Sequence, residues 1–151
     1  QWADPDARLF VAGNPSEEAL ETTIAERATG DARVATELRF VEEHEVPGIF
    51  GASDLVVLPY DDIMHSGSAL LALSFDRPVL VPDRGAMSEL QAHVGADWVR
   101  TYNGALTVET LADAMGWVES QDRSVRAPLD DLSWAPLARE TVDLYRRVLH
   151  S

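Results

Sequence analysis

The sequence predicts an α/β fold: a doubly wound, Rossmann-like parallel sheet with helices on both faces. Short apolar segments alternate with segments of helical pattern along the whole chain, and the connections between them are short. The segment 54–58 is apolar without a break after its first residue, which is typical of a strand that helices cover on both sides. At 151 residues, the chain is expected to form a single domain.

The first half of the chain contains three candidate strands. The first is a buried strand that ends in a Gly-Asn-Pro turn, and Ser16 is then expected to cap a helix that stops at Gly30. The expected elements of this half are a strand at 8–13, a helix at 16–28, a weaker strand at 37–41, a short helix at 46–51 and a strand at 54–58.

The second half continues the same alternation. Leu111, Met115 and Val118 have the spacing of one face of an amphipathic helix. The expected elements are a helix at 66–75, a strand at 78–81, a helix at 86–94, a strand at 98–102, a helix at 108–120 and, after an acidic linker with proline, a last helix at 134–149.

The net charge of the chain limits the classes of partner that it can bind. Arginine supplies all 12 basic residues, against 26 acidic residues, and the net charge is −14. Nucleic acid is excluded as a partner because its binding depends on Lys and Arg that neutralise phosphates. The sequence does not indicate peripheral association with a membrane, and it does not exclude it. A salt-adapted surface and a GC-rich genome that encodes Arg in place of Lys explain this composition equally well.

Neither a metal site nor a membrane span is expected. The chain has no cysteine, and His44, His93 and His150 lack a ligand-like spacing with His65. No apolar run approaches the roughly 20 residues that a membrane span needs. We therefore expect a cytoplasmic protein without a metal or a cofactor.

The turn Ser66-Gly67-Ser68 is the most informative local feature. It places hydroxyl groups and an unhindered backbone at the start of a helix, where free N–H groups and the helix dipole favour an anion such as phosphate. Ordinary helix capping by serine is the alternative explanation. The preceding Asp61 and Asp62 form a carboxylate pair suited to acid–base chemistry, although two adjacent Asp residues in so acidic a chain are more often simply solvated.

Read in order, these segments resemble the C-terminal, nucleotide-sugar-binding domain of GT-B fold glycosyltransferases, specifically of family 4. The similarity covers nearly the whole chain, and no single motif in it is decisive. The segments that carry it are Val11-Ala12-Gly13, 52–59, the small-residue turn and helix at 66–75, Arg77-Pro78-Val79, Gly85 with Glu89, and 133–146.

This resemblance implies that the chain binds a nucleotide diphosphate sugar as the donor substrate of a sugar transfer. Catalytic residues are not assigned, because the family places them in an N-terminal, acceptor-binding domain. The chain then looks like a fragment that also lacks the family's first strand, is inactive alone, and packs its C-terminal helix (132–149) toward that domain. The residues implied in donor binding are Gly13, Asn14, Phe40, Val41, Tyr60, Asp61, Asp62, His65, Ser66, Gly67, Ser68, Arg84 and Glu89.

Two positions depart from the family's pattern. The family has two glutamates here, separated by seven other residues, but this chain has Ile63 and Leu71 at those positions, and their side chains accept no hydrogen bond. Asp61 or Asp62 is a candidate substitute for the first glutamate, which contacts the sugar. The loss of both glutamates favours an alternative function, a non-catalytic or regulatory module that binds a sugar nucleotide. A receiver domain is disfavoured because it needs a lysine.

Overall fold

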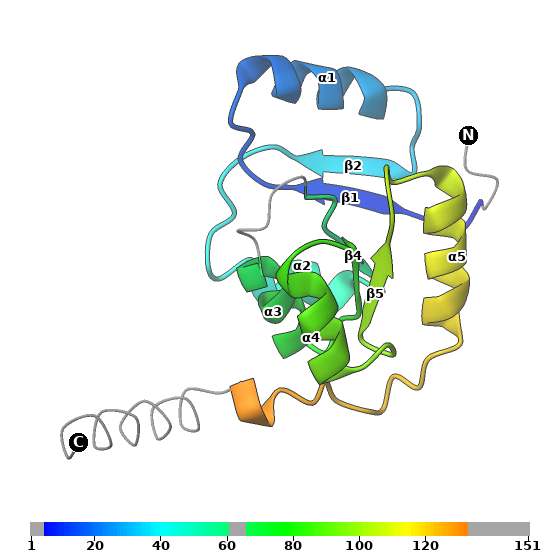
Figure 1. The fold of residues 1–151 in the computed structure, drawn as a ribbon. Helices are drawn as coiled ribbons and strands as arrows, with labels where there is room; N and C mark the ends of the chain where they lie inside the picture. The colour runs from blue at the N-terminus through cyan, green and yellow to red at the C-terminus, as the bar shows by residue number, and fades with distance from the viewer. Residues whose placement is uncertain (1–4, 61–65, 133–151) are drawn as a thin grey trace. The chain divides into compact units, whose positions relative to one another are not determined.

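The computed structural model describes residues 5–60 and 66–132 and confirms a Rossmann-like α/β architecture built on parallel strands. The chain divides into two compact units, Gln1–Gly51 and Ala52–Ser151, which are described one at a time. Figure 1 shows the helices and strands of each unit.

The first unit contains a parallel two-stranded sheet and its crossover helix. In this sheet Leu9 pairs with Val34 and Ala12 with Glu37. The unit runs through β1 (Leu9–Ala12), α1 (Glu18–Ala28), β2 (Val34–Glu37) and α2 (Val46–Ala52), whose last residue lies past the boundary of the unit.

The second strand lies earlier in the chain than the sequence predicts. The prediction placed it at 37–41, whereas the ladder starts where the Leu9 N–H donates to the Arg33 carbonyl and ends where the Gly13 N–H donates to the Glu37 carbonyl. Pairing with β1 therefore selects the segment with Val34 and Thr36, two β-branched residues that suit a strand. As a result Phe40 and Val41, predicted as part of the strand, lie in the loop that follows it.

Two further local predictions for this unit are wrong. Glu17, not Ser16, is the N-cap of α1, and no side-chain hydrogen bond caps this helix. The first strand forms but is not buried, since Leu9 and Phe10 remain 53% and 46% exposed. A two-stranded sheet with one crossover helix covers too little surface to enclose these side chains.

The second unit contains a three-stranded parallel sheet in the order β3-β4-β5. Most of its elements lie within one residue of their predicted bounds, whereas β3 is shorter than predicted and only half-buried, because it is an edge strand paired with β4 alone. The elements are β3 (Val56–Val57), α3 (Ser66–Ser74), β4 (Val79–Pro82), α4 (Ala86–Val94), β5 (Val99–Tyr102), α5 (Val108–Glu119) and the short 3-10 helix η2 (Asp130–Leu132).

Helices cover both faces of this three-stranded sheet (Figure 1). On one face Leu80 packs with Ala114 of α5, and the Arg100 guanidinium lies 5.6 Å from the centre of the Trp117 ring on the same helix. The opposite face carries Val79 and Val81, which are fully buried and lie on the side of α3 and α4. Every buried side chain of the described residues belongs to this unit.

The segment after α5 is fixed at the amino-terminal edge of the sheet. Arg123 forms an ion pair with Asp54, before β3, at 2.6 Å, and the Ala127 N–H donates to the Asp76 carboxylate, before β4, at 3.0 Å. Asp76 has a positive φ of 54°, a conformation that Asp tolerates better than most residues. These contacts leave the opposite, carboxyl edge of the sheet for the connections into α3 and α4. The predicted C-terminal helix lies outside the described residues apart from Leu132.

Candidate functional site

The carboxyl edge of the three-stranded sheet is where the predicted site residues of the second unit meet. Each strand is parallel to its neighbour, so β3 and β4 both end at this edge, and the following helices α3 and α4 begin there. In open α/β sheets this edge is the usual place for a ligand. Tyr60 lies here, in a tight turn where its N–H donates to the Leu58 carbonyl at 2.9 Å.

The predicted Ser66-Gly67-Ser68 turn forms the first turn of α3. The N–H groups of this turn have no earlier carbonyl within the helix to bond, which leaves them directed at the carboxyl edge. Gly67 is exposed, and among the described residues no atom lies within 4 Å of the place where its β carbon would stand. Among the described residues, nothing blocks the approach of a ligand to Gly67 at the start of α3. Asp61, Asp62 and His65 lie outside the described residues.

The loop from β4 to α4 brings Arg84 and Glu89 to the same edge. The Asp83 N–H donates to the Tyr102 carbonyl at 2.7 Å, which ties the loop to the end of β5. The Asp83 carboxylate accepts a hydrogen bond from Ser88 in the first turn of α4, and Gly85, with φ of 54°, makes the turn between them. Arg84 is exposed on this fixed loop, and Glu89 is exposed on the helix that follows.

Gly13 and Asn14 lie at the carboxyl edge of the other sheet, in the first unit. Gly13 has a φ of 144°, which a residue with a side chain rarely adopts, and its N–H donates to the Glu37 carbonyl at 3.1 Å. Asn14 is exposed. Because Glu37 is the last residue of β2, this bond places the 13–14 turn beside the loop that leads to Phe40 and Val41.

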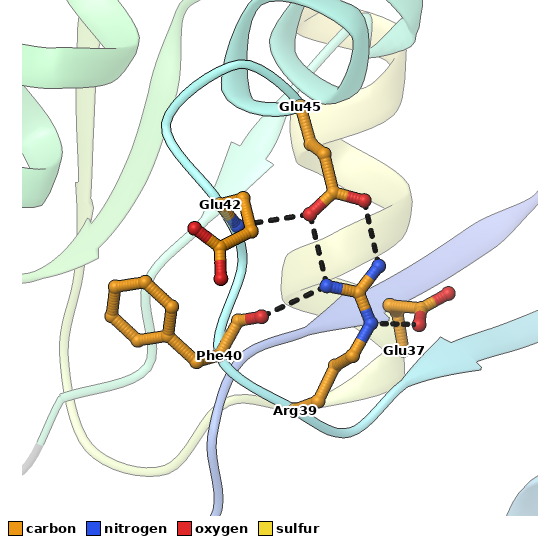
Figure 2. A network of polar contacts seen from close by, with 5 residues as sticks. All are labelled: Glu37, Arg39, Phe40, Glu42 and Glu45. Atoms are coloured by element: carbon orange, nitrogen blue, oxygen red, sulfur yellow. Dashed lines mark hydrogen bonds and ion pairs between the residues drawn. The ribbon is translucent and has the colours of Figure 1, made fainter.

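That loop is held by a cluster of charged side chains shown in Figure 2. The Arg39 guanidinium donates from Nε to Glu37 at 2.6 Å and from Nη1 and Nη2 to the two carboxylate oxygens of Glu45 at 2.9 and 2.6 Å. Nη1 also donates to the Phe40 carbonyl at 2.9 Å, and the Glu42 N–H donates to Glu45 at 2.9 Å. Sequence reasoning missed this cluster because charge spacing in a loop does not determine which side chains pair.

The cluster shifts the pKa values of its members. The hydrogen bonds from Arg39, followed by the bond from the Glu42 N–H, lower the pKa of Glu45 from 4.5 to about 2. The same bonds to Glu45, and then the one to Glu37, raise the pKa of Arg39 far above its usual value. Both groups are therefore charged at any physiological pH.

Phe40 and Val41, the two predicted site residues in this loop, differ in exposure. The Phe40 ring points away from the Arg39 guanidinium, and the residue is 68% exposed, whereas Val41 is half-buried. Among the hydrogen bonds between described residues, none uses the main-chain N–H or carbonyl of Val41. This loop therefore offers an aromatic face next to a main-chain donor and acceptor.

The described residues also bear on three earlier expectations. Leu71, at one of the two positions where the resemblance to family 4 implies a glutamate, is 42% exposed on α3, and Ile63 lies outside the described residues. No group of three or more His, Asp or Glu suited to a metal ion exists in the described ranges 5–60 and 66–132. Within those same ranges, no helix is both long enough and apolar enough to cross a membrane.

Comparison with known proteins finds two curated relatives, each 34% identical to this chain over 131 residues. Both are named GDP-mannose:glycolipid 4-beta-D-mannosyltransferase, one from strain ATCC 33913 of Xanthomonas campestris pv. campestris and the other from the same pathovar. The matched region is 87% of this chain, and the chain spans 38% of the length of these relatives. No family model and no solved structure matches the chain.

These matches support homology between this chain and part of a glycosyltransferase. This chain is therefore similar, over most of its own length, to part of a mannosyltransferase.

Proposed function

We propose that this chain is the donor-binding part of a glycosyltransferase and binds a nucleotide diphosphate sugar, with GDP-mannose as the donor. The observation that carries the proposal is the 34% identity over 131 residues to two enzymes whose names specify GDP-mannose. The carboxyl edges of the two parallel sheets support it, because each collects candidate residues at the place where α/β proteins bind ligands.

Within each unit, taken by itself, candidate residues suit one part of such a donor. The first turn of α3 would take phosphate oxygens through its N–H groups, with Arg84 as the nearby cation. In the first unit, Gly13, Phe40 and Val41 would face the nucleoside. The main task of such a site is to stabilise negative charge on the departing diphosphate, which N–H groups and an arginine can do without a metal ion.

The acceptor side of the reaction belongs to the proposal as well. By analogy with the relatives, we assign a glycolipid acceptor to the whole protein, bound by regions outside the matched 131 residues. In line with the resemblance to the C-terminal domain of family 4, we propose that those regions form an N-terminal domain. A cytoplasmic location is also proposed, since the donor site would draw on the cytosolic pool of nucleotide sugars.

A non-catalytic module that binds a sugar nucleotide is the second candidate. The observation that favours it is Leu71, an exposed apolar side chain where family 4 carries a glutamate. Both functions require donor binding, and only the first requires transfer in the protein that contains this chain.

Titration calorimetry with GDP-mannose, UDP-glucose and ADP-glucose tests donor binding, and Arg84→Ala tests the site. We expect GDP-mannose to bind most tightly and Arg84→Ala to weaken it about tenfold, because one charge-assisted contact to phosphate is lost. Arg126→Ala, an exposed arginine on the segment at the opposite edge of the same unit, is the matched control and should leave affinity unchanged.

A transfer assay then separates the two candidate functions. The protein that carries this chain is incubated with labelled GDP-mannose and a membrane lipid extract, and label in the lipid fraction is measured. Transfer supports the enzyme, while binding without transfer supports the module. Absence of binding to any sugar nucleotide by the folded chain would refute both.

A further inference from the structure

We propose that Arg39 is a positioning residue of the donor site, which acts through Glu37 and Glu45 to hold Phe40 against the nucleobase. This inference rests on the proposed function. It concerns a residue that the sequence did not single out, and it assigns Arg39 a task other than binding phosphate.

The cluster spans the whole connection between β2 and α2. Arg39 bonds Glu37, the last residue of β2, and chelates Glu45, which directly precedes α2, with contacts of 2.6 Å to each. Bidentate pairing between a guanidinium and a carboxylate fixes orientation as well as distance. The two ends of an eight-residue loop, 38–45, are thereby joined through one side chain.

Hydrogen bonds from the same cluster fix the backbone on both sides of Val41. Arg39 holds the Phe40 carbonyl and Glu45 holds the Glu42 N–H, each at 2.9 Å. No side chain of residues 38–45 is fully buried, so apolar packing alone does not hold this loop. The polar cluster is therefore the main restraint on the loop conformation.

The polar cluster holds an aromatic ring, that of Phe40, on the surface of the first unit. Phe40 is 68% exposed, and Figure 2 shows its ring on the side away from the guanidinium. Exposed aromatic rings are suited to stacking on nucleobases, which all present a flat π face. A ring held in place before the ligand arrives loses less conformational entropy when it binds.

The geometry also argues against phosphate binding by Arg39. Its Nε, Nη1 and Nη2 atoms all donate to protein oxygens, and two carboxylates surround its single positive charge. A phosphate at this position would compete with Glu37 and Glu45 for the same N–H groups and would be repelled by their charge. Loss of Arg39 should therefore affect recognition of the base and not of the phosphates.

The test measures GDP and UDP affinities by calorimetry for the unmodified chain and for variants. We expect Arg39→Ala to weaken GDP binding about tenfold and to bring the ratio of GDP to UDP affinity close to one, because guanine, with two fused rings, stacks on Phe40 more strongly than uracil and therefore loses more when the ring is no longer held. Phe40→Ala should behave in the same way. Arg39→Lys, which keeps the charge but not the bidentate geometry, should restore only part of the affinity.

Arg33→Ala is the matched control in the same unit. Arg33 precedes β2 at its other end and forms an equally short ion pair with Asp31, at 2.6 Å. Its loss removes a comparable surface contact and should leave both nucleotide affinities unchanged. If Arg39→Ala does not fold by circular dichroism, Glu45→Gln provides the same test, because it breaks the chelate with little change of shape.

The outcomes separate this inference from the proposed function. If the unmodified chain binds GDP and Arg39→Ala binds it equally well, the positioning role is wrong and donor binding stands. An equal loss of GDP and UDP affinity in Arg39→Ala, or equal affinity of the unmodified chain for both, also overturns the inference. If the folded chain binds neither nucleotide, the proposed function fails and this inference fails with it.

Discussion

Gly67, in the first turn of α3, and Gly116, in α5, both have open space where a β carbon would stand. A β carbon at either site meets no atom of the described residues, and valine has a somewhat better helix propensity than glycine, so the free energy of unfolding should change by less than about 0.5 kcal/mol. We expect Gly67→Val to abolish GDP binding, because the isopropyl group occupies space that the proposed donor needs. Gly116→Val should leave binding intact.

Calorimetry and urea unfolding of both variants check this prediction. A Gly67→Val protein that folds normally and binds GDP as tightly as the unmodified chain would refute close approach of the donor to α3. Equal loss of binding in the two variants would point to an indirect effect on the fold.

The N-cap of α5 makes a side-chain hydrogen bond, whereas the N-cap of α1 does not. Thr107 is the N-cap of α5, and its hydroxyl accepts a hydrogen bond from the Thr110 N–H at 3.2 Å. Thr107→Ala should lower the free energy of unfolding by about 1 kcal/mol. Ser16→Ala is the matched control and should be nearly neutral, because Ser16 is not the N-cap of α1. Urea unfolding of both variants measures the difference, and a cost at Ser16 equal to that at Thr107 would contradict the observed caps.

The ion pair between Arg39 and Glu45, in the loop between β2 and α2, makes the stability of the folded chain depend on pH. Hydrogen bonds from Arg39 lower the pKa of Glu45 to about 2, so its carboxylate stabilises the folded state above the pKa of the unfolded chain, near 4.5. This contribution is complete above about pH 5 and is lost as the pH falls toward 2.

Thermal unfolding between pH 6 and pH 2 measures this contribution. Glu45→Gln, which cannot ionise, should lose less stability over this range than the unmodified chain. Parallel pH profiles for the two proteins would show that the ion pair with Arg39 does not contribute to stability in solution.

Elements defined by local pattern were predictable from the sequence, and elements defined by pairing were not. The helix at 86–94 was predicted at its observed bounds, and β4, β5, α3 and α5 lie within one residue of theirs because local pattern sets them, whereas β3 is shorter than predicted. β2 was placed three residues too late, because its position depends on the register with β1. The Arg39 cluster was missed for a related reason, since loop conformation decides which charges meet.

The net charge of −14 governs the behaviour of the whole molecule. At low ionic strength the acidic side chains repel one another, and salt at 1 M reduces the Debye length to about 3 Å. We therefore expect the melting temperature to rise between 0.05 M and 1 M KCl. Equal ionic strength of NaCl is the control for specific ion effects. A melting temperature that falls with added salt would show that loss of surface ion pairs outweighs relief of repulsion.

The sequence by itself determined the α/β class, the order of strands and helices, and the positions in the chain at which candidate ligand-binding residues follow strands. These properties depend on periodicity and turn residues, which are local. Only the tertiary structure decided the register of β2, the exposure of Phe40 and the pairing of Arg39 with Glu37 and Glu45. Such contacts join residues through space, so their formation depends on where packing and hydrogen bonding place the backbone.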